Sequence, residues 1–138
     1  MTKNDVYEKI TNLCKDLNPS KSAIEDIFLF MGGKSKNMSS AKTIVTLAVF
    51  NRTASLACYH NSSNIKFYSV HEIRKIIKSS YSDIKSKIAK EEMPDIIIKY
   101  LEPSFNKIIN RKGNIAKETF DEADGIAVAW ACALQEVK

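Results

Sequence analysis

The chain has 138 residues, of which 44% are hydrophobic and 27% are charged, with only four glycines and three prolines. This composition excludes a disordered or low-complexity chain and predicts one globular domain spanning residues 1–138. The formal net charge of +5 at pH 7 mildly favours an anionic partner such as nucleic acid, although many basic proteins of this size bind none.

A helix is predicted first. Apolar residues from Val6 to Leu17 recur at helical spacing. Asn4 or Asp5 could cap the start of this helix, and the Asn-Pro pair at 18–19 ends it.

Residues 23–30, AIEDIFLF, are predicted to form a strand in the middle of a sheet, because they are apolar and bounded by turn residues. Glu25 interrupts this apolar run. A carboxylate inside a central strand is costly unless it lies at the strand end and faces a cation or a polar cleft. Glu25 is therefore a candidate functional residue.

The next stretch, residues 31–39 (MGGKSKNMS), is predicted to be a basic loop. Its Gly-Lys-Ser resembles the end of a phosphate-binding P-loop, but that motif needs a glycine where Phe28 stands, so a nucleotide site is rejected. Lys34 and Lys36 could instead contact a DNA backbone, because they follow an acidic strand end.

A long helix follows, capped by Ser39 or Ser40 and ending at about His60. Its small residues permit close packing against the sheet or against a partner subunit. Residues 64–70, NIKFYSV, alternate in character and predict a second strand.

Two basic helices are predicted next, over residues 71–78 and 83–90. Their cations are Arg74, Lys75, Lys78, Lys85, Lys87 and Lys90. Together they could form a wall that contacts phosphates, although a solvated lysine face explains each helix equally well. Residues 93–101 are then predicted to form an apolar helix that ends before Pro103. Residues 110–114 are predicted to form a mobile basic loop.

The last predicted helix covers residues 120–134, FDEADGIAVAWACAL, and has no polar face from Ile126 onward, so it belongs in the core. Asp121 and Asp124, at i and i+3, share one side of its first turn, where backbone N–H groups favour ionised carboxylates. Such a pair suits Mg²⁺ or Mn²⁺, although acids at a helix start commonly act only as caps.

The three cysteines, Cys14, Cys58 and Cys132, lie far apart in apolar helical patterns and are predicted to be buried thiols. With no C-x-x-C pair and only two histidines, a zinc site and a His-dependent nucleophile are both weakly supported. Neither a signal peptide nor a membrane-spanning run is recognisable, so we expect an intracellular, cytoplasmic protein with no membrane partner.

In their order and spacing, these features resemble the RuvC-type Holliday junction resolvases of the RNase H-like nuclease superfamily. The resemblance runs from about Val6 to the C-terminus. It rests on the strand AIEDIF, the long helix with SSAK at 39–42, the strand NIKFYSV before a basic helix, and the final DEADGIAVA. It implies an α/β fold of the RNase H-like class, with a mixed sheet flanked by helices.

The resemblance implies a metal-dependent, structure-selective endodeoxyribonuclease that cleaves four-way DNA junctions in recombination and repair. Glu25, Asp121 and Asp124 match the family's catalytic metal ligands, with Mg²⁺ or Mn²⁺ as the cofactor. The implied chemistry is two-metal hydrolysis, with ions about 4 Å apart that activate water and stabilise the leaving oxygen. Family members are homodimers, which suits a two-fold symmetric junction.

The resemblance also implies contacts to branched DNA. Phe28 falls where the family places an aromatic ring that stacks on a base at the junction centre. Arg74 and Lys85 approximately match two basic residues that contact the scissile region, which makes Lys85 a further catalytic candidate. With the basic loop included, the DNA-binding candidates are Phe28, Lys34, Lys36, Arg74, Lys75, Lys85 and Lys87.

One departure concerns the family's N-terminal strands, which supply another catalytic aspartate and are absent here. Asp5 is no substitute, because it starts a helix. We expect a fragment, a degraded homologue or a site completed by a partner, and a sheet without its central strands should associate through its exposed edges. The alternatives are a non-catalytic nucleic-acid-binding or assembly module, and an RNase H-like protein that acts on RNA in ribosomal RNA maturation.

Overall fold

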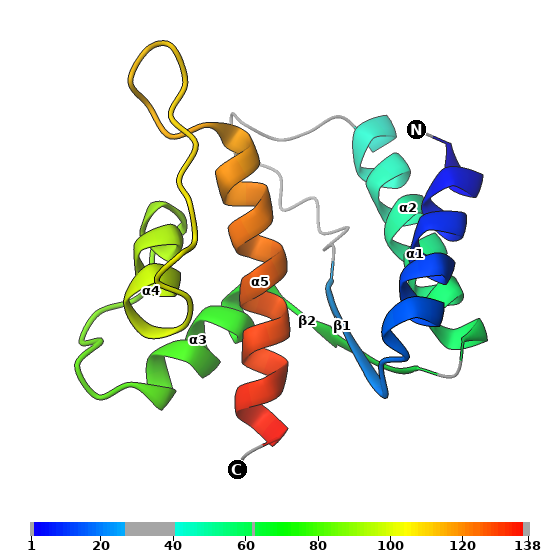
Figure 1. Cartoon of the computed structure of the whole chain (residues 1–138), viewed down its shortest axis with the longest axis horizontal. Helices are drawn as coiled ribbons and strands as arrows, with labels where there is room; N and C mark the ends of the chain where they lie inside the picture. The colour runs from blue at the N-terminus through cyan, green and yellow to red at the C-terminus, as the bar shows by residue number, and fades with distance from the viewer. Residues whose placement is uncertain (1, 27–40, 62, 137–138) are drawn as a thin grey trace. The chain divides into compact units, whose positions relative to one another are not determined.

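The computed structural model describes residues 2–26, 41–61 and 63–136 (Figure 1). The chain divides into two compact units, Met1–Ser69 and Val70–Lys138. Most described residues are helical, and the strands among them form a two-stranded parallel sheet. The predicted mixture of helices and strands is therefore confirmed, while the RNase H-like arrangement and the single domain stay predictions.

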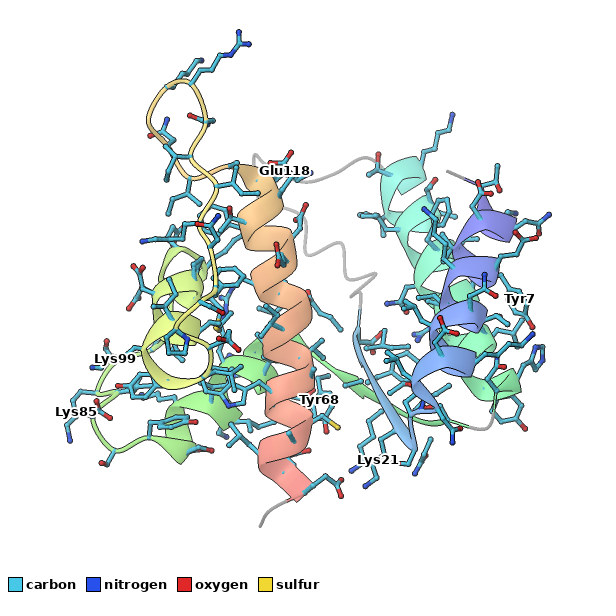
Figure 2. All side chains as sticks on the ribbon, viewed as in Figure 1. Tyr7, Lys21, Tyr68, Lys85, Lys99 and Glu118 are labelled. Carbon is cyan, nitrogen blue, oxygen red and sulfur yellow. The ribbon has the colours of Figure 1, made fainter. Side chains whose placement is uncertain are left out.

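The first unit is a strand–helix–strand crossover with one additional helix before it. Its elements are α1 (Lys3–Leu17), β1 (Lys21–Glu25), α2 (Ala41–His60) and β2 (Asn64–Tyr68). Strand β1 pairs in parallel with β2, from Lys21 opposite Asn64 to Glu25 opposite Tyr68. Parallel neighbours need such a long crossover, and here it contains α2. Helices α1 and α2 pack against each other, and Tyr7 is hydrogen-bonded to Nδ1 of His60 at 2.7 Å (Figure 2).

Helix α1 ends at the predicted residue but begins two to three residues earlier than predicted, with a different cap. Thr2 is the N-cap, and its hydroxyl accepts a hydrogen bond from the backbone N–H of Asp5 at 3.2 Å. The Asp5 carboxylate accepts the N–H of Thr2 at 2.7 Å in return, which completes a capping box. Asn18 ends the helix in the left-handed conformation with φ of 46°, a position that asparagine tolerates.

Strand β1 begins two residues before the predicted strand, and Glu25 is its last residue. Its side chains from Ser22 to Glu25 are half-buried, and residues 27–30 of the predicted strand lie outside the described residues. Strand β2 and helix α2 match their predicted extents closely. The predicted caps of α2, Ser39 and Ser40, also lie outside the description.

The second unit is helical. It contains α3 (Val70–Ser80), a short 3₁₀ helix at Lys90–Glu92, α4 (Met93–Tyr100) and α5 (Lys117–Glu136). Helix α5 packs against both α3 and α4 (Figure 1). The core is formed by fully or nearly fully buried side chains, among them Ile73, Ile77, Ile88, Ile97, Ala123, Ala127 and Trp130. The predictions of helices at 71–78 and 93–101 are confirmed within one to two residues at each end.

The predicted basic helix over residues 83–90 is wrong. Helix α3 ends at Ser80, and residues 81–89 run without regular structure. The hydroxyls of Ser79 and Ser80 both donate to the carbonyl of Ile76, at 3.1 and 2.9 Å, and so compete with further helical bonds. The ring of Tyr81 packs 4.6 Å from Tyr100, between centroids, which draws the chain away from the helix axis.

Helix α5 begins three residues earlier than predicted, so Asp121 and Asp124 are its fifth and eighth residues and lie beyond its first turn. The prediction of a core helix is confirmed, because Ala127, Val128, Trp130, Ala131 and Cys132 are buried. All three cysteines are free and buried, as predicted. Among the described residues, no helix combines the length and hydropathy that a membrane span requires.

Candidate functional site

The acidic pair of α5 has two different environments. Asp121 is exposed, whereas Asp124 is half-buried. Burial raises the pKa of Asp124 above its ordinary value, and the nearby Asp121 raises it further, while Lys90 and Arg74 lower it. The sequence predicted that a helix N-terminus would keep both acids ionised. Because the pair lies beyond the first turn of α5, the helix N-terminus is not what sets the pKa of Asp124; burial has the largest effect on it.

The two cations near Asp124 come from separate elements. Arg74 projects from α3, which packs against α5. Lys90 starts the short helix before α4, and its Nζ lies 6.0 Å from the ring centroid of Phe120, one residue before Asp121. The α5 acids therefore share their surroundings with cations, an arrangement that could bind an anionic phosphate beside carboxylates.

A cavity of about 290 Å³ lies on α3, and Arg74, which lowers the pKa of Asp124, is one of its lining residues. It is lined by His71, Arg74, Lys75, Lys78, Lys87 and Ile88, and we call it the α3 basic pocket. Its lining includes four formally charged cations and no acid. An adjoining hollow, which shares Lys75 and Lys78, continues along Ser79, Tyr81, Ser82 and Ile84. Such a row of cations suits a chain of phosphates.

A hydrogen bond between Tyr100 and Asp83 ties α4 to the segment that follows α3. The Tyr100 hydroxyl donates to the Asp83 carboxylate at 2.5 Å, and Lys99 donates to the same oxygen at 3.4 Å. The Tyr81 ring also lies 5.6 Å from Trp130, a buried residue of α5. These contacts fix the start of the 81–89 segment, which then supplies Lys87 to the pocket.

The structure therefore brings together part of the predicted DNA-binding set. Arg74, Lys75 and Lys87 line one cavity, while Lys85 is exposed and does not line it. His71 and Lys78 also line the cavity. Lys78 belongs to the predicted phosphate-contacting wall but not to the DNA-binding candidates, and His71 was not predicted as a site residue. Their spacing was a usable signal, because residues 71, 74, 75 and 78 share one face of a helix.

Glu25 lies in the first unit, and its position is set by α2. The side-chain amide of Asn51 donates to the backbone carbonyl of Glu25 at 2.8 Å. Arg52 forms an ion pair with Asp26 at 3.1 Å, and its guanidinium stacks 4.6 Å from the ring centroid of Phe67 on β2. Consecutive α2 residues therefore hold the carboxyl end of β1.

The structure does not bring the remaining candidate residues from the sequence into one described site. Phe28, Lys34 and Lys36 lie outside the described residues. Glu25 belongs to the first unit, whereas Asp121 and Asp124 belong to the second. Among the described residues, no three His, Cys, Asp or Glu side chains are grouped closely enough to hold a metal ion.

The donor chemistry of the α5 acids nevertheless fits Mg²⁺ or Mn²⁺. Both ions prefer oxygen ligands, and Mg²⁺ commonly binds through one or two carboxylates together with water and substrate phosphate. Asp121 and Asp124 supply such oxygens from one side of α5, and Arg74, which acts on Asp124, also lines the α3 basic pocket. Comparisons of the chain with protein-family models, with curated proteins and with solved structures gave no match.

Proposed function

We propose that this chain is a metal-dependent endonuclease that cleaves four-way DNA junctions. One observation carries the proposal: Arg74 both lines the α3 basic pocket and lowers the pKa of Asp124. A phosphate held by the pocket would therefore lie near the α5 carboxylates. That combination of cations and acids is what phosphodiester hydrolysis requires of a protein.

Each group has a role in this proposal. The pocket cations bind and orient the phosphate backbone, and Asp121 and Asp124 would hold Mg²⁺ or Mn²⁺. Glu25 of the first unit is the third acidic ligand that the family resemblance implies. When bound, the ion supplies a Lewis acid and lowers the pKa of its water ligand. Lys85, exposed on the segment that also supplies Lys87, contacts the scissile region. A homodimer would present two such sites to a two-fold symmetric junction.

The pocket itself favours a second candidate, a nucleic-acid-binding module without catalysis. Its lining binds phosphate through cations alone, and no step of that binding needs a carboxylate or a metal. Under this candidate the chain binds branched DNA in the presence and absence of Mg²⁺ with similar affinity and leaves it intact.

Incubation with three labelled substrates separates the candidates. The purified chain is mixed with a four-way DNA junction, a linear duplex of the same sequence, or a matching RNA, with Mg²⁺, Mn²⁺ or a chelator. Symmetrical nicks in the junction that require metal support the endonuclease. Binding without nicks in either metal supports the second candidate, and preferential cleavage of RNA would overturn the assignment to DNA.

A further inference from the structure

The segment between α4 and α5 is positively charged. Between Glu102 and Glu118 it contains no acid and four cations, Lys107, Arg111, Lys112 and Lys117. Lys107 is engaged, since its Nζ donates to Asp95 of α4 at 2.8 Å. Arg111 and Lys112 are exposed, and neither makes an ion pair within the described part of the chain. Two cations are therefore available to an outside partner.

These two cations stand at the end of a short hairpin, residues 108–116, which we call the basic hairpin. Ile109 and Ile115 form an antiparallel bridge, and the N–H of Ala116 donates to the carbonyl of Ile108 at 2.7 Å. The N–H of Asn110 donates to the carbonyl of Asn114 at 2.8 Å. The loop extends beyond the first turn of α5 (Figure 1).

Asn110 makes the end of the basic hairpin rigid. Its side-chain oxygen accepts the backbone N–H groups of Lys112 and Asn114, at 2.9 and 3.0 Å. Its carbonyl accepts the N–H of Gly113 at 3.0 Å, and Gly113 has φ of 83°, a conformation that favours glycine. The sequence predicted a mobile loop here. The bonds instead show a defined turn, so its cations lose less freedom on binding.

The base of the basic hairpin is fixed to α5. Thr119 is completely buried, and its hydroxyl accepts the backbone N–H of Ile108 at 2.8 Å. Thr119 lies two residues before Asp121, so the base of the hairpin and the acidic pair are carried by the same helix, α5. Ile108 and Ile109 are 47% and 55% exposed, which places apolar surface beside the cations.

We propose that the basic hairpin is a second nucleic-acid contact, separate from the α3 basic pocket. Arg111 and Lys112 bind backbone phosphates, and Ile108 and Ile109 pack against sugars or unstacked bases. Cations without neighbouring acids, next to exposed apolar side chains, match the alternating phosphate and sugar surface of a DNA strand. The inference rests on the proposed function, because it assumes that the chain binds DNA.

The test compares two double variants of equal charge change. Arg111→Gln with Lys112→Gln removes the cations of the hairpin, and Lys9→Gln with Lys15→Gln removes two exposed cations of α1 as a control. Binding of a labelled four-way junction is measured by fluorescence anisotropy in chelator, between about 50 and 200 mM salt. The hairpin variant should bind roughly 10-fold more weakly, and its salt slope should fall by about 2, while the control keeps both values.

A second pair tests the turn itself without changing charge. Asn110→Ala removes the side chain that holds the turn. Asn114→Ala is the control, because the Asn114 side chain makes no hydrogen bond to the described residues. Only Asn110→Ala should weaken binding. If the wild type binds the junction and the hairpin variants bind equally well, the hairpin contact is refuted and the proposed function stands. If the wild type binds no DNA, both fail.

Discussion

One hydrogen bond, between Tyr100 and Asp83, shifts the pKa values of both side chains. The Tyr100 hydroxyl is the main reason why the pKa of Asp83 lies below its ordinary value of about 3.9. The same bond raises the pKa of Tyr100. The contribution of Asp83 to stability is therefore present above pH 3.9 or so and is lost as pH falls through its folded pKa. The contribution of Tyr100 to stability is present below about pH 10 and is lost as pH rises through the folded pKa of Tyr100.

Replacing Tyr100 with phenylalanine should raise the pKa of Asp83 toward its ordinary value, because the hydroxyl is lost while the ring can still pack against Tyr81. The carboxyl carbon of Asp83, followed by NMR across acidic pH, reports the shift. Tyr59→Phe, at an exposed ring in the first unit, is the control. An Asp83 titration that is the same in both variants would contradict the account.

Asn51 is expected to stabilise the first unit through its bond to the Glu25 carbonyl. Asn51→Ala leaves that partly buried carbonyl without this donor, so the free energy of unfolding should fall by about 1 kcal/mol. Urea unfolding measures the change. Asn12→Ala, on the exposed side of α1, is the control and should have little effect. Equal losses of stability in the two variants would show that the Asn51 bond does not stabilise the first unit.

At the scale of elements, the basic residues of α3 were predictable, but their pocket was not. Arg74, Lys75 and Lys78 could be placed on one helix from the sequence. Lys87 joins them only because residues 81–89 turn back instead of forming a helix. Ile84 and Ile88 have helical spacing, and the sequence alone contains no sign that Tyr81 packs between α4 and α5.

Lys78 should contribute to DNA binding as a member of the α3 basic pocket. Lys78→Gln is expected to lower the salt slope for junction binding by about 1, as loss of one phosphate contact would. Lys66→Gln, an exposed position on β2, changes the net charge equally and should keep the slope. Anisotropy titrations over a range of salt give both slopes, and identical slopes would exclude Lys78 from the contact.

Helix α5 and the chain before it depend on Thr119. Thr119→Val preserves the shape of the buried side chain but leaves the N–H of Ile108 without its acceptor. We expect a loss of about 1–3 kcal/mol in the free energy of unfolding, whereas Thr119→Ser should retain most of the stability. Thermal and urea unfolding of both variants measure this, and a valine variant as stable as the wild type would show that the bond contributes nothing.

At the scale of the whole chain, the candidate acids are distributed over two units. Most helices and both described strands were predictable from periodicity and turn residues. The surroundings of Asp124 were not, because Arg74 and Lys90 reach it from distant parts of the chain. Helix α2 leaves Val45, Leu56 and Tyr59 between 49% and 71% exposed, so the expected association of the chain stays a prediction.

The central claim is that the chain cleaves four-way junctions with a metal ion and needs Glu25 and the α5 acids to do so, and cleavage of a four-way junction tests it most directly. Glu25→Gln and Asp124→Asn should each abolish metal-dependent nicking and leave junction binding in place. Glu122→Gln, an exposed acid two residues before Asp124, should cleave like the wild type. If both site variants still nick the junction, or if Glu122→Gln loses activity equally, the proposed site is wrong.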